Sequence, residues 1–131
     1  MADLLIVEDD ADAANALSAL LEFEGHVVRT AYNGEEGLQR LEERVPELVL
    51  LDIEMPILDG PNMAYRMLLH NLDFEKVPIV LVSGVPNLRS IAAHVGTHYF
   101  LPKPFTLERL TSVLERALEE RSPPQPQLPS R

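Results

Sequence analysis

Cysteine is absent from this sequence of 131 residues, and basic residues are scarce. Without cysteine the chain can form no disulfide, no thiolate zinc site and no cysteine nucleophile. Lysine and arginine together number 11 against 21 acidic residues, which gives a formal net charge of −10. Such a charge repels phosphate backbones, so direct nucleic-acid binding is not expected, whereas cations and basic partners are favoured.

Long apolar runs are also absent. No stretch reaches the length of a membrane span, and MADLLIVEDD at the start has neither the basic region nor the cleavage-type end of a secretion signal. We therefore expect a cytoplasmic protein that makes no membrane contact.

Apolar residues are nevertheless abundant, and their distribution suggests one domain. At 46% of the chain they are sufficient to build a core at this length. The final segment, SPPQPQLPSR, holds four prolines and has no apolar period. The predicted organisation is a domain over residues 1–121, followed by a linker or tail over residues 122–131.

Short runs of strand type alternate with segments of helical period. The runs cover residues 4–7, 26–31, 47–51, 78–82 and 98–101, and three of them are continuously apolar, as in strands covered on both faces. Apolar stripes at helical spacing follow four of the runs: Leu17, Leu20 and Leu21; Leu38, Leu41 and Val45; Met63, Met67 and Leu68; Leu107, Leu110, Leu114 and Leu118. With a helix also after the fourth run, the pattern predicts an α/β fold, a doubly wound parallel sheet of five strands in the order 2-1-3-4-5.

Turn-forming residues mark the expected helix ends. Asn33, followed three residues later by a glutamate, resembles a capping box, and Thr106 is a plausible N-cap. Gly25 and Gly96 fall where the first and fourth helices should end. The fourth helix is expected to begin near Asn87 and to be short, about two to three turns.

Acidic side chains follow the first and third predicted strands. Glu8 and Asp9 come after the first strand and Asp52 after the third. Because the carboxyl ends of parallel strands meet at one edge of a sheet, these three carboxylates should converge. Such a cluster is costly without a cation, and oxygen-only ligands favour Mg²⁺ or Mn²⁺. The alternative is that the run Glu8 to Asp10 is only a solvated acidic loop.

The fourth and fifth strands bring two further groups. Ser83 ends the fourth strand, and Lys103 stands between Pro102 and Pro104, which stiffen the backbone around it. A hydroxyl and an ammonium would then surround Asp52 beside the metal site. This set suits an aspartate nucleophile that accepts a phosphoryl group, because the charged phosphoryl oxygens need a cation and hydrogen-bond donors.

Four segments of the sequence resemble the signature blocks of the response-regulator receiver domain of two-component signalling. They are LLIVEDD, LVLLDIEMPILDG, PIVLVSG and YFLPKPF, in the family's order over residues 3 to about 120. The resemblance implies a flavodoxin-like fold, a cis Lys103–Pro104 peptide bond and a shared phosphorylation site. Its expected roles are Mg²⁺ binding by Glu8, Asp9, Asp52 and the Glu54 backbone carbonyl, phosphoryl acceptance by Asp52, phosphoryl binding by Lys103, and switching by Ser83 and Phe100.

The resemblance also implies partners. The phosphoryl donor would be a phosphohistidine on a sensor histidine kinase or a histidine phosphotransfer protein. The domain would promote its own phosphorylation and dephosphorylation as a phosphoacceptor and not as an enzyme. Its output would be a change in the face formed by the fourth helix, fifth strand and fifth helix, which a downstream effector reads. Because the fourth helix is short, we expect a monomer or a weak dimer.

The sequence departs from the family pattern at several positions. Glu8 stands where aspartate is commoner, and Phe100 replaces the frequent tyrosine, so it is either a switch residue or a core phenylalanine. Gly84 leaves the phosphoryl group open to water. The run from Ser83 to Lys103 is about two residues shorter than is usual in the family.

Other functions fit less well. A metal-dependent phosphatase with an aspartate nucleophile needs a second acid two residues after the first, as in a D-x-D element. In this chain that position is Glu54, within DIEMP. A nucleotide or flavin binder needs a glycine-rich loop after the first strand, where this chain is acidic. The remaining alternatives are a pseudo-receiver that docks partners without phosphorylation, and a receiver fragment of a larger kinase or transcriptional regulator.

Overall fold

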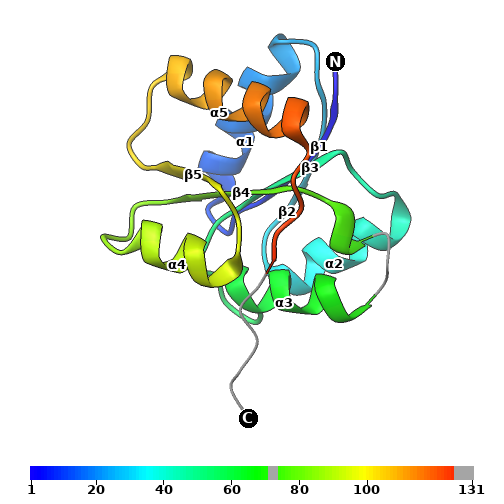
Figure 1. Ribbon diagram of the computed structural model, residues 1–131. Coiled ribbons are helices and arrows are strands. Elements are labelled where there is room, and N and C mark those ends of the chain that lie inside the picture. Colours follow the sequence, from blue (N-terminus) through cyan, green and yellow to red (C-terminus); the bar gives the residue numbers. More distant parts are fainter. Residues whose placement is uncertain (71–73, 126–131) are drawn as a thin grey trace.

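The computed structural model describes residues 1–70 and 74–125, in which strands and helices alternate along the chain (Figure 1). The strands are β1 Asp3–Val7, β2 Val27–Ala31, β3 Leu48–Leu51, β4 Ile79–Ser83 and β5 Tyr99–Pro102. The helices are α1 Ala11–Phe23, α2 Gly34–Glu43, α3 Gly60–His70, α4 Leu88–Val95 and α5 Leu107–Glu120, with a short 3-10 helix η1 at Phe74–Lys76. Every predicted strand and helix is present.

The strands form one parallel sheet in the order β2-β1-β3-β4-β5, which confirms the predicted fold class. Its register decides where the acidic residues lie. Val7 at the end of β1 pairs with Leu51 at the end of β3. Glu8 and Asp52, each one residue further on, therefore leave the sheet side by side at its carboxyl edge.

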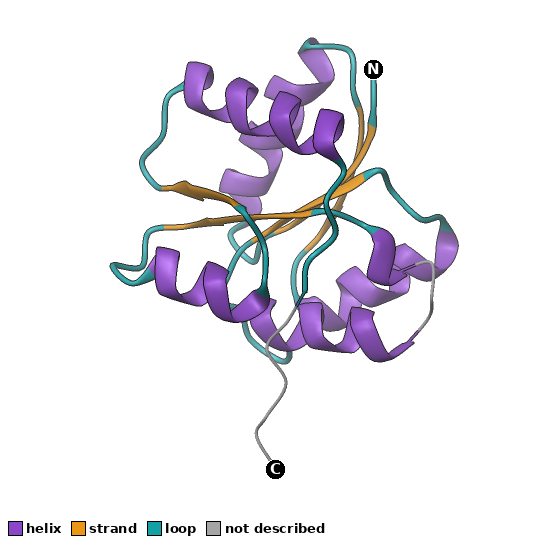
Figure 2. Ribbon diagram, viewed as in Figure 1, coloured by secondary structure: helices purple, strands orange, loops and turns teal. Residues whose placement is uncertain are grey.

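Helices cover both faces of the sheet. Figures 1 and 2 show α1 and α5 on one face and α2, α3 and α4 on the other. The core is divided in the same way, because alternate residues of a strand point to opposite faces. Leu4 and Ile6 of β1 pack in the cluster with α1 and α5, whereas Leu5 and Val7 pack in the cluster with the other three helices.

The predicted caps are present. The Asn33 side chain accepts a hydrogen bond from the Glu36 backbone N–H at 2.8 Å, and Thr106 Oγ1 accepts one from the Arg109 N–H at 3.2 Å. Gly96 ends α4 in the left-handed region at φ 85°. The predicted short fourth helix is also confirmed, since α4 has 8 residues and follows Asn87.

The strand ends differ from the predicted runs by at most one residue, and one helix ends before its predicted apolar stripe does. The α2 helix ends at Glu43, and Val45 lies outside it with 41% of its surface exposed. Pro46 explains this, because a proline disfavours helical backbone in the residue before it. The β5 strand continues to Pro102, which an edge strand tolerates.

Two further predictions can be compared with the structure only over the described residues. Residues 122–125 of the predicted tail are described, whereas residues 126–131 lie outside the described part. Within residues 1–70 and 74–125, none of the helices combines the length and the apolar character needed to cross a bilayer.

Candidate phosphorylation site

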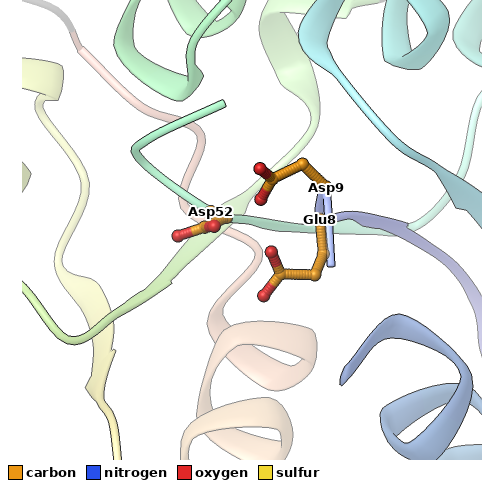
Figure 3. A group of neighbouring side chains, drawn as sticks. All are labelled: Glu8, Asp9 and Asp52. Carbon is orange, nitrogen blue, oxygen red and sulfur yellow. The ribbon is translucent and has the colours of Figure 1, made fainter. Parts of the chain in front are cut away.

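Three carboxylates meet at the carboxyl edge of the sheet. Glu8, Asp9 and Asp52 each place one oxygen within 4.8 Å of the others, and Figure 3 shows their side chains directed into a common space. Glu8 is buried, Asp52 is half-buried and Asp9 is exposed. The donor atoms of this group are all carboxylate oxygens, which fits a hard divalent cation such as Mg²⁺ better than zinc or copper.

The third acidic residue of the run has a different structural role. Asp10 is the N-cap of α1, and its Oδ1 accepts hydrogen bonds from the Asp12 and Ala13 N–H groups at 3.0 and 3.2 Å. Capping fixes the start of α1 directly after Glu8 and Asp9. The alternative of a purely solvated acidic loop therefore fails for this run, since one residue caps a helix and the other two line the cluster.

Lys103 reaches the acidic cluster from β5. Its Nζ donates to Glu8 Oε1, and its backbone N–H donates to the Ser83 carbonyl at 2.9 Å. The Lys103–Pro104 peptide bond is cis, as predicted. The ammonium lies beside the Glu8 carboxylate, on a side chain that is still partly exposed.

The ionisation of the cluster is uneven. Burial, and then the neighbouring Glu8 carboxylate, raise the pKa of Asp52 to about 7. Burial acts to raise the pKa of Glu8 as well, but hydrogen bonds with Asp52 and Lys103 bring it below its ordinary value. Burial acts to lower the pKa of Lys103, yet Glu8 keeps it raised. The ion pair thus forms between Glu8 and Lys103, whereas burial and the Glu8 carboxylate disfavour ionisation of Asp52.

A cavity of about 420 Å³ brings the predicted phosphorylation residues together. Asp52, Glu54, Ser83 and Lys103 all line it, together with residues 84–86. Ser83 is buried, and its Oγ accepts a hydrogen bond from the Val85 N–H at 3.4 Å, so its hydroxyl proton is free to be donated into the cavity. An acidic, a hydroxyl-bearing and a basic residue thus line one cavity.

The family profile of the response regulator receiver domain matches residues 4–115 of this chain. The chain belongs to this family. It is a receiver domain of a response regulator, a signalling domain of two-component systems.

Curated relatives extend well beyond this receiver domain. It is 36% identical over 121 residues to the nitrogen assimilation regulatory protein NtrX of Azorhizobium caulinodans, covering 89% of this chain and 26% of that protein. It is 37% identical over 123 residues to the CpxR homolog of Haemophilus influenzae, a transcriptional regulatory protein, covering 89% of this chain and 52% of that one. The chain therefore spans between about a quarter and a half of these relatives.

Solved receiver domains share the fold. The receiver domain of NtrX from Brucella abortus superposes with a TM-score of 0.78 at 35% identity, covering 89% of this chain and 98% of that one. The chemotaxis protein CheY4 of Vibrio cholerae superposes with a TM-score of 0.77 at 28% identity, covering 88% and 98%.

Phe100, the predicted switch aromatic, lies away from the cavity residues. It packs against the core cluster that contains the buried face of α4, and the Arg89 guanidinium stands over its ring at 5.7 Å. Phe100 is only partly buried, so it occupies the boundary between the core and the surface of α4. This placement is compatible with both interpretations that its sequence position allowed.

Gly60 supports the site in a way that the sequence did not indicate. A Cβ at this position would lie 2.1 Å from the Asp52 carbonyl oxygen, so only glycine allows the start of α3 to approach so closely. The Gly60 N–H also donates to the Ile53 carbonyl at 2.9 Å. An Asp-Gly pair before a helix, as at Asp59-Gly60, is typical of a helix cap, and it carries no signal of a contact with the backbone of Asp52.

A second cavity, of about 600 Å³, adjoins the site on the α1 side. Asp52 and Lys103 are among its lining residues, and apolar side chains form most of the remainder: Ala13, Ala16, Leu17 and Leu20 of α1, with Pro104 and Phe105 after β5. We name this cavity the α1 groove. It provides an apolar surface that leads directly to the carboxylate cluster.

Proposed function

We propose that Asp52 accepts a phosphoryl group from a phosphohistidine, carried by a sensor histidine kinase or a histidine phosphotransfer protein. The observation that carries the proposal is the cavity in which Asp52, Ser83 and Lys103 meet beside the acidic cluster. Among the three carboxylates of the cluster, Asp52 is the one that lines the same cavity as Ser83 and Lys103. The other two carboxylates of the cluster do not line it.

The transfer is a displacement at phosphorus. A carboxylate oxygen of Asp52 forms a new P–O bond while the P–N bond to the histidine breaks, and the imidazole leaves with the electron pair. The Lys103 ammonium, now held by Glu8, donates to the phosphoryl oxygens and offsets their charge. The Ser83 hydroxyl, which lines the same cavity, donates to another phosphoryl oxygen.

A divalent cation belongs to this site. Glu8, Asp9, Asp52 and the Glu54 backbone carbonyl would hold Mg²⁺, with Mn²⁺ as the alternative. When bound, the cation supplies positive charge that keeps Asp52 ionised and neutralises the phosphoryl oxygens. The same arrangement lets the domain promote both its own phosphorylation and the later hydrolysis of the acyl phosphate, without turnover of a separate substrate.

The α1 groove suits the docking of the phosphodonor protein. Its apolar lining can receive apolar side chains of a donor helix, and because Asp52 and Lys103 line the same cavity, a donor docked there brings its phosphohistidine close to the nucleophile. The output side is the face formed by α4, β5 and α5, which an effector would read after phosphorylation. We assign the receiver domain to residues 1–121 and its place of action to the cytoplasm.

The test is the intact mass of the protein after incubation with acetyl phosphate or phosphoramidate, with and without Mg²⁺. Phosphoramidate carries the P–N bond of a phosphohistidine without a partner protein. Wild type should gain one phosphoryl group in Mg²⁺ only, and Asp52→Asn should gain none. Asp59→Asn is the matched control, because Asp59 lies near the same edge of the sheet but caps α3 through the Asn62 N–H.

Two results would contradict the proposal. If wild type gains no phosphoryl mass with either donor in Mg²⁺, the chain is a pseudo-receiver that docks partners without phosphorylation. If Asp52→Asn is still labelled, another residue is the acceptor.

A further inference from the structure

The chain after α5 changes direction sharply and crosses the edge of the sheet. Arg121 ends α5 in the left-handed region at φ 52°, and its N–H donates to the Ala117 carbonyl at 2.8 Å. Its guanidinium binds Glu47 Oε1 at 2.8 Å, just before β3. Figure 1 shows the following residues passing from the layer of α1 and α5 to the layer of α4. The tail therefore does not continue the axis of α5.

The end of this crossing is fixed to α4. Pro124 is buried, whereas its neighbour Pro123 is exposed. The Gln125 N–H donates to the carbonyl of Gly96, the residue that ends α4, at 3.0 Å. Gly96 has no room for a side chain on this side, because a Cβ would lie 1.9 Å from the Gln125 carbonyl oxygen. A proline-rich segment that composition alone suggests is free thus has a buried residue and a backbone partner.

We propose that residues 122–125 form a strap that ties the end of α5 to the end of α4. The α4 helix depends on such a tie more than a long helix does. It has only 8 residues, three of which are buried, and among the described residues its N-cap Asn87 receives no side-chain capping bond. A contact at the C-terminal end of α4 therefore contributes a substantial part of the interactions that stabilise this helix.

The strap couples the tail to the phosphorylation site, a step that rests on the proposed function. Ser83 Oγ holds the Val85 N–H at the start of the segment leading to α4. When Ser83 turns to a phosphoryl group, this segment shifts, and α4 moves as a short rigid body. Because Gly96 moves with α4, the hydrogen bond from the Gln125 N–H to the Gly96 carbonyl weakens. The strap thus responds to the state of Asp52.

The strap itself is tested by amide hydrogen exchange at Gln125 in the full chain. Its amide should exchange at least about tenfold more slowly than in an unstructured peptide, the protection expected of a bond that opens locally. Pro124→Asp should remove this protection, and Pro123→Asp should keep it. Gly96→Ala should also remove it, whereas Gly25→Ala should not, because Gly25 has a similar φ of 96° but no atom within 4 Å of its Cβ position.

These variants separate the tie from general destabilisation. The two glycines have similar positive φ values, so the clash with Gln125 is the main difference between the two variants. A Gln125 amide that exchanges at the unstructured rate in wild type overturns the strap. So does equal protection in Pro124→Asp and Pro123→Asp.

The coupling is tested with beryllofluoride and Mg²⁺, a phosphoryl mimic. Gln125 exchange should become about tenfold faster in wild type and stay unchanged in Asp52→Asn. The Ser83 amide resonance reports separately whether the mimic binds. If Ser83 shifts while Gln125 exchange is unchanged, the coupling is wrong. If the Ser83 resonance does not shift, the proposed function is wrong. The strap is then tested by the Gln125 exchange of the variants without the mimic.

Discussion

Removing the charge of Asp52 should stabilise the metal-free protein. Asp52, Glu8 and Asp9 hold carboxylate oxygens within 4.8 Å of one another, and Lys103 is the basic side chain that pairs with the group. One ammonium cannot neutralise three carboxylates in a half-buried site. Asp52→Asn keeps the shape of the side chain and removes one negative charge, so it relieves repulsion without leaving a cavity.

The size of the effect follows from the geometry. Two like charges 4.8 Å apart repel by about 3.5 kcal/mol at an effective dielectric constant of about 20. Solvent reaches half-buried Asp52, the Lys103 ammonium opposes the repulsion, and partial protonation relieves it further. We therefore expect Asp52→Asn to raise the free energy of unfolding by about 2 kcal/mol.

The pH dependence has a definite sign. The folded-state pKa of Asp52 is raised to about 7 from 3.8. The penalty of ionising it is complete above the folded pKa, shrinks as pH falls through that value, and disappears below the unfolded pKa. The advantage of the variant should therefore be largest near about pH 8 and smaller by more than half near about pH 5.

Urea unfolding in EDTA at both pH values measures the difference. Asp59→Asn is the control and should stay within about 0.5 kcal/mol of wild type, because asparagine caps a helix as well as aspartate. Mg²⁺ should stabilise wild type more than Asp52→Asn, since the variant lacks one ligand. An Asp52→Asn protein no more stable than wild type at the higher pH would refute the repulsion argument.

Four further predictions concern other parts of the domain. Ile57 is 81% exposed with φ 68°, so Ile57→Asn should raise the free energy of unfolding by about 1 kcal/mol in urea, and a decrease would contradict the strain. Thr97→Val should lower the free energy of unfolding by about 2 kcal/mol, because buried Thr97 Oγ1 makes hydrogen bonds with two backbone groups. Thr97→Ser should recover most of the loss. Gly84→Ala places a methyl group 3.8 Å from Lys103 Cβ and should slow the loss of phosphoryl mass by shielding it from water; unchanged decay would exclude shielding. Sedimentation of the beryllofluoride complex should show a monomer or weak dimer, and a stable micromolar dimer lost on mutating α4 would contradict this.

The fold could be predicted because its signals are local. Continuous apolar runs mark strands that are covered on both faces, and the five observed strands match the predicted runs to within one residue at each end. Helix ends follow from single residues with a local role, such as the capping side chain of Asn33 and the left-handed backbone that Gly96 adopts without strain. The exception, Val45, shows the limit of periodicity, because its apolar spacing continued the helical stripe while the proline after it opposed a helical backbone.

The members of the site could also be predicted, because a parallel sheet places the residues after its strands at one edge. The side-chain partners of these residues could not be predicted, since pairing depends on how far each side chain reaches and not on spacing in the sequence. Glu8 and Asp9 are neighbouring carboxylates in the sequence, yet of the two only Glu8 is buried and binds the Lys103 ammonium. Asp10 carries the same charge and caps a helix.

The positions that escaped prediction share one physical cause. The contact of Gly60 with the Asp52 carbonyl and that of Gly96 with Gln125 both join segments that are distant or unpatterned in sequence, through backbone atoms that every residue possesses. Composition describes side chains, so it indicated correctly that residues 122–125 contribute no apolar stripe. It carried no information on the backbone N–H of Gln125, whose partner exists only because α4 ends in a residue without a Cβ. The glycine therefore serves two purposes: it ends α4 in the left-handed region, and it opens the space that the strap occupies. A larger residue at Gly96 would disturb both, which is why the matched substitution at Gly25 is needed to tell them apart.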